Sequence, residues 1–179
     1  MPIVFADPAV ATSTSATEPR LLTERLELRY FRRADHGAYA AMWEKPEFYR
    51  YLGDGTPKPA DFAARFATSL SFSRGVFAVV VRATRELIGH CGIRPIPDGR
   101  IELLYAYDPT AWGQGYATEA ARAVLEYGRA HFEIDELIAM AYPANAASGN
   151  VIRKLGFTLM GQEEHFGAML DVYSLTETP

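Results

Sequence analysis

The sequence predicts a single α+β domain in which antiparallel strands come first and one parallel crossover follows. Two β-rich runs, 76–81 and 87–93, flank a short polar connection, which is typical of a hairpin. A helical repeat at 115–131 precedes another β-rich run at 137–142, and a strand–helix–strand unit joins parallel neighbours through a right-handed crossover. With 179 residues, 49% of them hydrophobic, the chain can bury a sizeable core.

The chain begins with a segment that we expect to be flexible. Residues 1–19 are rich in Ala, Ser and Thr and show no periodicity, so we place the single domain at 20–179. Its first strand is expected within 21–31, where Leu26 and Leu28 alternate with charged residues.

Helices and turns are expected around the hairpin. Residues 35–43 and 61–72 place apolar side chains at helical spacing, and 48–59 form a loop rich in Gly, Pro and aromatic residues. Pro97-Asp98-Gly99 is a turn signal, because Pro presets φ and Gly accepts a positive φ. This turn leads into a strand at 101–107.

The second half of the chain alternates helices and strands. The helix expected at 115–131 has a face of small residues that lets it lie close to a sheet. A shorter helix is expected at 146–155, with Gly156 in the left-handed position that ends many helices. The last β-rich runs, 157–164 and 169–175, are expected to form an antiparallel pair.

Composition and charge exclude several classes of function. Lys and Arg number 18 against 22 Asp and Glu, so the net charge of −4 gives no broad positive field for nucleic acid. The single cysteine, Cys91, excludes a disulfide framework and fits a reducing, cytoplasmic setting. No apolar run is long enough to span a membrane, and the four histidines lack metal-ligand spacing, so we expect neither a membrane partner nor a metal.

A glycine-rich segment joins the strand at 101–107 to the helix at 115–131, and it reads Trp112-Gly113-Gln114-Gly115-Tyr116-Ala117-Thr118-Glu119-Ala120. Glycines let the backbone approach a ligand, and the first helical turn has unpaired N–H groups at its positive end. The segment therefore predicts a phosphate or pyrophosphate site. It lacks the Gly-Lys-Ser/Thr of a Walker loop, and Thr118 stands where a dinucleotide fingerprint needs a third glycine. A connection that binds nothing is the alternative.

A second motif lies at the start of the helix expected at 146–155. Asn145 is a good N-cap, and Ser148 shares the apolar face of this helix with Val151 and Ile152. A hydroxyl that points to the interior needs a hydrogen-bond partner. Ser148 therefore either bonds to the backbone near the cap or faces a ligand.

With these motifs the chain resembles the GNAT-type acetyl-CoA-dependent N-acetyltransferases, and it is most similar to the branch that includes the ribosomal-protein N-terminal acetyltransferases. The glycine-rich segment corresponds to that family's R/Q-x-x-G-x-G/A loop, with Trp112 in place of Arg or Gln. Asn145-Ala146-Ala147-Ser148 and Lys154-Leu155-Gly156-Phe157 correspond to its N-x-x-S…K-L-G-F motif. The resemblance implies a mixed, mostly antiparallel seven-stranded sheet with a splayed parallel central pair, flanked by about four helices.

The resemblance also implies acetyl-CoA as cofactor and the residues that bind it. Its pyrophosphate would lie on the main-chain amides of the loop, which belong to Gly113, Gln114, Gly115, Tyr116, Ala117 and Thr118. Its pantetheine arm would enter between the splayed strands, where main-chain groups of Ala106 and Tyr107 would pair with it. Asn145 and Ser148 would lie beside the same arm.

Acetyl transfer to an amine needs a base and an acid, because the amine must lose a proton and the departing thiolate must gain one. Glu102 is the candidate base, acting directly or through water, since its otherwise apolar strand would raise its pKa. An ion pair with Arg94 or Arg100 is the alternative role for Glu102. Ser148 is the candidate acid, and the possible substitutes are Tyr142 and Tyr173.

The sequence thus predicts an enzyme that moves an acetyl group from acetyl-CoA to an amine by direct attack on the thioester. The acceptor is a small amine or a protein N-terminus, and a homodimer is left open. Four aromatic residues either line the acceptor pocket or belong to the core: Trp43, Phe48, Tyr49 and Tyr51. Two other classes compete with this prediction, namely a sensor that binds acyl-CoA without reacting and a nucleotide-binding enzyme.

Overall fold

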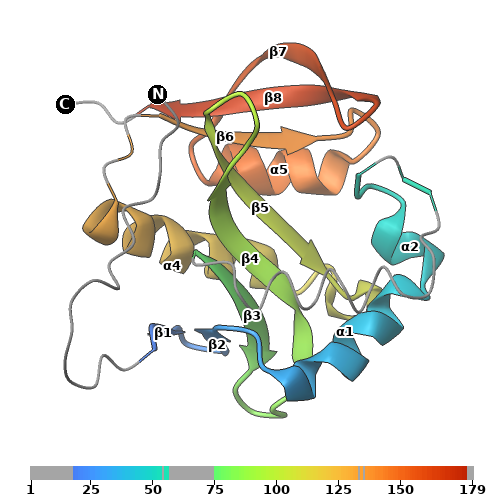
Figure 1. Cartoon of the computed structure of the whole chain (residues 1–179), viewed down its shortest axis with the longest axis vertical. Coiled ribbons are helices and arrows are strands. Elements are labelled where there is room, and N and C mark those ends of the chain that lie inside the picture. The colour runs from blue at the N-terminus through green and yellow to red at the C-terminus, as the bar shows by residue number, and fades with distance from the viewer. Residues whose placement is uncertain (1–17, 54, 57–74, 133, 135, 177–179) are drawn as a thin grey trace.

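A single mixed sheet forms the centre of the molecule. The structure is a computed structural model that describes residues 18–53, 55–56, 75–132, 134 and 136–176. Eight strands follow the order β1-β2-β3-β4-β5-β6-β8-β7, and every neighbouring pair is antiparallel except β5 and β6 (Figure 1). The predicted α+β class with one central parallel pair is therefore confirmed, with eight strands in place of seven.

The strands are β1 (Arg20–Leu22), β2 (Leu26–Arg29), β3 (Val76–Val81), β4 (Leu87–Pro95), β5 (Ile101–Tyr107), β6 (Glu136–Ala141), β7 (Thr158–His165) and β8 (Ala168–Thr176). The α-helices among the described residues are α1 (His36–Trp43), α2 (Pro46–Tyr49), α4 (Tyr116–His131) and α5 (Ala146–Lys154). Short 3₁₀ turns occupy Arg33–Asp35 and Pro109–Ala111. Within this described part of the chain, no helix is both long enough and apolar enough to cross a lipid bilayer.

The amino-terminal region corrects the prediction of one strand over 21–31. The chain forms the hairpin β1–β2 there, and the Thr23 N–H donates to the Leu26 carbonyl across its turn (3.0 Å). This turn is stabilised by α4, because the Thr23 hydroxyl and the Arg25 N–H both donate to the Glu119 carboxylate (2.5 and 2.9 Å). No local pattern reveals a contact between residues 94 positions apart, so the sequence analysis missed the extra strand.

The loop predicted at 48–59 is also corrected, because its first residues belong to the short helix α2. Pro46 opens this helix, and its fixed φ suits a first helical position. Four residues are too few to show a helical repeat in the sequence. Residues 1–17 of the predicted flexible segment and the helix predicted at 61–72 lie outside the described residues.

Of three buried apolar clusters, the two largest cover opposite faces of the sheet. One packs against α4 and α5 and includes Leu103, Tyr105 and Tyr107 of β5. The other packs against α1 and α2, and Leu104 and Ala106 of β5 contribute to it. The predicted small-residue face of α4 is confirmed, because its buried residues are Ala120, Ala121, Val124, Leu125 and Gly128.

The parallel strands β5 and β6 lie together only at their start. The register pairs Ile101 with Leu137, Glu102 with Ile138 and Leu103 with Ala139, and neither strand pairs with the other beyond that point although both are fully described. β5 continues along β4 as far as Tyr107, whereas β6 continues along β8 as far as Ala141. The predicted splayed pair is therefore confirmed, and it divides the sheet into two halves.

The carboxyl end of α5 has the predicted cap. Gly156 is left-handed (φ +95°), its N–H donates to the Arg153 carbonyl (3.0 Å), and the Phe157 N–H donates to the Ile152 carbonyl (3.3 Å). These two bonds define a Schellman motif. The buried Phe157 ring follows directly, so the cap fixes α5 against the sheet.

A buried ion pair fixes the start of α1. The Arg29 guanidinium donates to both carboxylate oxygens of Asp35 (2.7 and 2.8 Å), and the Arg32 N–H donates to one of them (2.7 Å). Burial raises the pKa of Asp35, but the hydrogen bonds from Arg29 and Arg32 outweigh burial, so the pKa lies below its ordinary value. The pair joins the start of α1 to β2 beside the core that packs against α1 and α2.

We expect Asp35→Asn to lower the free energy of unfolding by about 3 kcal/mol at pH 7, because it leaves a buried guanidinium without its charge partner. A carboxylate with a lowered pKa stabilises the fold above its unfolded pKa of about 3.9, and that stabilisation is lost as the pH falls through the folded pKa. The difference between wild type and variant should therefore shrink at pH 3, which urea unfolding at both pH values measures.

Asp98→Asn is the matched control, because Asp98 also pairs with an arginine but is 38% exposed at its side chain. It should cost about 1 kcal/mol or less. Equal losses in the two variants would contradict a special role for the buried pair.

Candidate active site

The gap between β5 and β6 opens into a cavity of about 660 Å³. Most of the predicted site residues line it, namely Glu102, Ala106, Tyr107, Gly113, Ala117, Asn145 and Ser148. The other predicted residues, Gln114, Gly115, Tyr116 and Thr118, are their neighbours in the loop and the first turn of α4 but do not line the cavity. The fold thus brings the two sequence motifs to one place.

The glycine loop presents main-chain donors at the start of α4. Gly113 and Gly115 are left-handed (φ +75° and +80°), a conformation that glycine adopts without strain. Gly115 is the N-cap of α4 and no side chain caps the helix, so the N–H groups of residues 116–118 have no acceptor inside it. A Cβ on Gly113 would meet nothing within 4 Å, which leaves open space beside the loop. The loop can therefore bring several amides to one anion.

Arg25 holds this loop from the β1–β2 turn. Its Nη1 donates to the Gln114 carbonyl (2.8 Å), its Nε donates to the Glu119 carboxylate (2.7 Å), and its guanidinium lies 4.6 Å from the centre of the Tyr116 ring. Sequence reasoning missed Arg25, because its position next to the loop depends on the unforeseen hairpin. Arg25 acts on the carbonyl side of the loop and leaves the amides of the first turn available.

Trp112 connects the loop to the end of β5. Its indole Nε1–H donates to the Tyr107 carbonyl (2.8 Å), and half of the residue is exposed. The side chain that stands in place of the family's Arg or Gln therefore stabilises the strand-to-loop connection through a neutral hydrogen bond.

The register of β4 and β5 decides which main-chain groups of β5 face the gap. The Asp108 N–H donates to the Ile88 carbonyl (2.8 Å), and hydrogen-bonded pairs alternate along an antiparallel ladder. Ala106 therefore directs its main-chain groups to His90 of β4, and it offers the cavity its methyl group. Tyr105 and Tyr107 direct their main-chain groups away from β4, toward the gap. This alternation adds Tyr105 to the residues considered for the pantetheine arm.

Glu102 is buried at the fork where β5 and β6 part. It is 6% exposed, it lines the cavity, and its Oε2 accepts a hydrogen bond from Arg94 Nε (3.0 Å). Burial raises the pKa of Glu102, and the opposing effect of the Arg94 charge does not cancel that increase. The ion pair considered as an alternative thus exists, with Arg94 as the partner, and it coexists with a carboxyl group that holds its proton more tightly than usual. Arg100 pairs with Asp98 and Glu163 instead.

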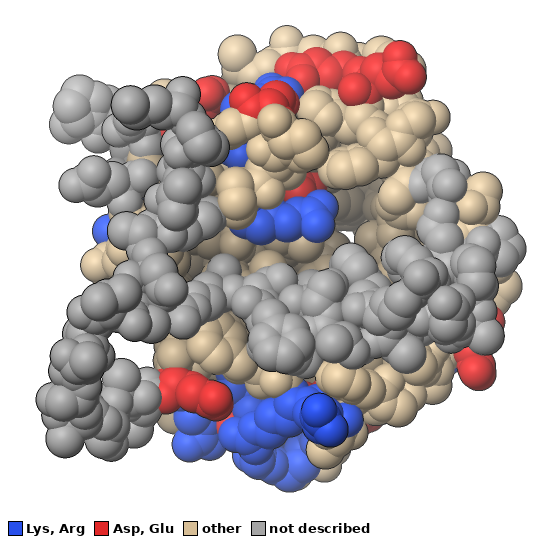
Figure 2. Space-filling model, in the orientation of Figure 1, with Lys and Arg blue, Asp and Glu red and all other residues tan. Residues whose placement is uncertain are grey.

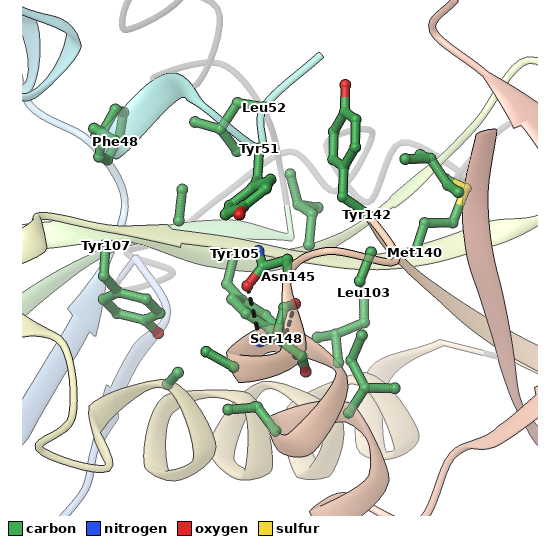
Figure 3. A pocket seen from close by; sticks show the side chains of 18 of the residues that line it. Phe48, Tyr51, Leu52, Leu103, Tyr105, Tyr107, Met140, Tyr142, Asn145 and Ser148 are labelled. Atoms are coloured by element: carbon green, nitrogen blue, oxygen red, sulfur yellow. Dashed lines mark hydrogen bonds between the residues drawn. The ribbon is translucent and has the colours of Figure 1, made fainter. Parts of the chain in front are cut away.

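Ser148 faces a tyrosine across the cavity wall. Its Oγ lies 3.0 Å from the Tyr105 hydroxyl, while Asn145 Oδ1 accepts from the Ser148 N–H and caps α5 (3.2 Å; Figure 3). The Ser148 hydroxyl therefore meets a side chain of β5 and not the backbone of the cap. Burial raises the pKa of Tyr105 far above its ordinary value, so its hydroxyl keeps its proton. The sequence analysis did not single out Tyr105, because the contact joins β5 to α5.

The two tyrosines considered as substitutes for Ser148 are engaged elsewhere. The Tyr142 hydroxyl donates to the Gly53 carbonyl (2.7 Å), and its ring lies 5.7 Å from that of Tyr51. The Tyr173 hydroxyl accepts from Arg153, and Tyr173 does not line the cavity. Of the two, only Tyr142 borders the cavity.

Most of the remaining lining of the cavity is apolar, and Glu47 and His90 are its polar members. Of the four aromatic residues left open between pocket and core, Trp43, Phe48 and Tyr51 line this cavity and Tyr49 does not. Other apolar lining residues come from the segment after α2, from β6 and β8, and from the turn between β7 and β8: Leu52, Met140, Leu170 and Phe166. Figure 3 shows Tyr51 and Leu52 on one side of β5 and Ser148 on the other. Within the described residues, no group of three or more His, Cys, Asp or Glu side chains could hold a metal.

Comparison with known proteins agrees with this geometry. The model of the acetyltransferase (GNAT) domain matches residues 25–158. An uncharacterized N-acetyltransferase of Bacillus licheniformis, p20, is 31% identical over 165 residues, which cover 86% of this chain and 92% of that protein.

Two solved structures illustrate the likeness in fold. An acetyltransferase from Agrobacterium tumefaciens superposes with a TM-score of 0.74 and 27% identity, over 92% of this chain and 98% of that one. RimL, a ribosomal L7/L12 alpha-N-protein acetyltransferase in complex with coenzyme A, superposes with a TM-score of 0.71 and 18% identity, over 88% and 98% of the two chains. The family model covers most of the chain, and the loop, the splayed strands and the capped α5 all fit it; the chain therefore belongs to the GNAT family of acetyltransferases.

Proposed function

We propose that this enzyme transfers an acetyl group from acetyl-CoA to a primary amine, with Glu102 as base and Ser148 as acid. The observation that carries the proposal is their placement on one cavity but on opposite faces of β5. Tyr105, the partner of Ser148, packs with the core under α4 and α5, whereas Glu102 shares its face with Leu104 and Ala106 under α1 and α2. A base and an acid on opposite sides of a gap suit a reaction whose two partners approach from opposite sides.

The residues present fit coenzyme A. Its diphosphate would lie on the amides of residues 113–118, and its amide-bearing arm would meet the main-chain groups of Tyr105 and the N–H of Tyr107, which face the gap. Bound acetyl-CoA supplies an acetyl group activated as a thioester. The cavity volume of about 660 Å³ lies within the range of small-molecule sites.

Glu102 and Ser148 would move the two protons. Glu102 takes a proton from the amine, directly or through water, and its raised pKa makes it a stronger base than an exposed glutamate. Ser148 gives a proton to the departing thiolate while an N–C bond replaces the C–S bond, and the proton that the nitrogen loses to Glu102 returns through water to restore the Ser148 hydroxyl. Tyr105 positions Ser148, because its hydroxyl lies within hydrogen-bond distance of both the Ser148 carbonyl (3.3 Å) and Ser148 Oγ (3.0 Å). When this hydroxyl donates to Oγ, the proton of Ser148 is free to point into the cavity.

The sensor alternative is disfavoured by the same residues. A buried carboxyl group at the fork costs desolvation free energy, and binding of acyl-CoA by main-chain amides gives no reason to keep it. Release of free thiol from acetyl-CoA with a panel of amines separates the two. The acceptor, a small amine or a protein N-terminus, the cytoplasmic location and the homodimer stay predictions.

Glu102→Gln is expected to lower kcat/KM for the amine about 10²-fold at neutral pH. Protonation of the amine alone makes log kcat/KM fall with a slope of one below the amine pKa. In the wild type this slope should increase from one to two below the pKa of Glu102, because the protonated carboxyl cannot act as a base. The raised pKa puts this change of slope above the ordinary glutamate value of about 4.3. The same steep limb in the Gln variant would exclude Glu102 as the base.

Ser148→Ala should lower kcat, on the order of 10²-fold, with little change in KM. Tyr105→Phe should also lower kcat, but the double variant should be no slower than Ser148→Ala alone, because Tyr105 acts through Ser148. Tyr142→Phe is the control, and its effect should multiply with that of Ser148→Ala. Fully multiplicative effects of Tyr105→Phe and Ser148→Ala would refute the coupling.

Gly115→Ala is expected to weaken coenzyme A binding about tenfold, since a left-handed alanine costs about 1–2 kcal/mol and the loop can avoid that cost only by moving its amides. Gly99→Ala imposes the same backbone strain (φ +91°) in the turn between β4 and β5 and should leave binding unchanged. Calorimetry with coenzyme A, ATP and NAD measures both effects, and tight binding of ATP or NAD instead would favour the nucleotide-binding class.

A further inference from the structure

Arg94 presents an unused edge of its guanidinium to the cavity. Its Nε donates to Glu102 (3.0 Å), and its two Nη groups have no hydrogen-bond or ion-pair partner within the part of the chain that the structure describes. The side chain is 37% exposed and lines the cavity beside the proposed base. Four of the five N–H donors of this guanidinium are therefore available at the site.

The other charged groups around the cavity make Arg94 distinctive. The lining contains two carboxylates, Glu47 and Glu102, and Arg94 is the only Lys or Arg among the described lining residues. His90 does not add a second cation, because burial lowers its pKa to about 3. In Figure 2, basic and acidic side chains lie next to one another at the edge of a hollow in this face of the molecule. The site thus offers one positive and two negative groups.

Arg100 shows what a structural arginine looks like in the same region. Its guanidinium donates to both oxygens of Glu163 (3.1 and 2.5 Å) and twice to Asp98 Oδ2 (2.9 and 2.6 Å). An arginine whose donors are used in this way holds the turn at Asp98 to the strand at Glu163. Arg94 uses only its Nε–H for the pair with Glu102. A side chain with fewer donors could make that one bond, so the pair alone does not explain why this position is an arginine.

The geometry points to an acceptor that carries a carboxylate next to its amine. A guanidinium edge with two parallel donors matches a carboxylate, and the charge-assisted bonds strengthen where water is partly excluded. The guanidinium is one rigid plane. An anion bound at its two Nη groups therefore lies close to the Glu102 carboxylate, which is bound at the neighbouring Nε group. An acceptor whose amine meets Glu102 while its carboxylate meets Arg94 therefore carries the two groups close together, as an α-amino acid does.

We propose that the acceptor is a free α-amino acid with an apolar side chain, and that Arg94 binds its carboxylate. The inference rests on the proposed function, since it assigns the acceptor of that same reaction. The apolar wall formed by Trp43, Phe48, Tyr51 and Leu52 receives the side chain. Arg94 thereby determines specificity, and Glu102 remains the proposed base.

The test compares phenylalanine, phenylalaninamide and phenethylamine as acceptors, and leucine with its amide and isoamylamine as a second set. The readout is the ratio of kcat/KM for the acid to that for its two carboxylate-free analogues, measured by release of free thiol from acetyl-CoA. Arg94→Gln should lower this ratio about 10- to 100-fold, the loss expected for a hydrogen bond to a charged group. Differences in amine pKa cancel, because the same acceptors are compared in both enzymes.

Arg100→Gln is the matched control and should leave the ratio unchanged, because Arg100 is already saturated by Asp98 and Glu163. Arg94→Lys keeps the positive charge but loses the two parallel N–H donors, so it should retain only part of the preference for acceptors with a carboxylate. This variant also provides the test if Arg94→Gln does not fold. A ratio that stays constant in the Arg94 variants overturns the inference, as does an equal loss of activity on all acceptors or a preference for peptides with a free N-terminus over amino acids.

Failure of the inference differs visibly from failure of the proposed function. Acetylation of amines without any Arg94-dependent preference for a carboxylate removes the inference and leaves the acetyltransferase reaction in place. No thiol release with any amino acid, amine or peptide removes the proposed function itself.

Discussion

The separation of β5 from β6 after Leu103 is the constraint on which the site depends. Each strand keeps its outer neighbour, so the sheet becomes two halves joined by three residue pairs. The inner edge of β5 then carries main-chain groups at Tyr105 and Tyr107 that no strand satisfies, and among them the Tyr107 carbonyl accepts from the Trp112 indole. Polar backbone groups away from water need partners, and an amide-bearing ligand in the gap would supply them for the other groups.

The two faces of β5 give the cavity two different chemical environments. On one face, Tyr105 and Ser148 form a neutral hydroxyl pair above the core that packs against α4 and α5. On the other face, Glu102 and Arg94 form a charged pair beside the aromatic residues of α1 and α2. Strand alternation alone produces this division, because successive side chains point to opposite faces. One seven-residue strand therefore carries residues that we assign to both proton transfers.

The site could be predicted where its residues lie close together in the sequence. The glycine loop and the start of α5 are helix termini, and the groups that terminate a helix are local to it: Gly113, Gly115, Asn145 and Gly156 are recognisable without neighbours. The strand expected at 101–107 is also local, and its alternation puts Glu102 and Tyr105 on opposite faces. By contrast, Arg25, the Tyr105–Ser148 contact and the free edge of Arg94 involve side chains from separate elements, which no local pattern could bring together.

The sequence by itself determined the order of the elements, the glycine loop that begins α4 and the residue types available for proton transfer, because these depend on periodicity and on backbone preferences within a few residues. Tertiary structure decided the extra hairpin strand, the depth at which Glu102 is buried and the partners of Ser148 and Arg94. Burial and pairing depend on which distant elements pack together, and packing satisfies all elements at once. The assignment of roles at the cavity therefore required the fold.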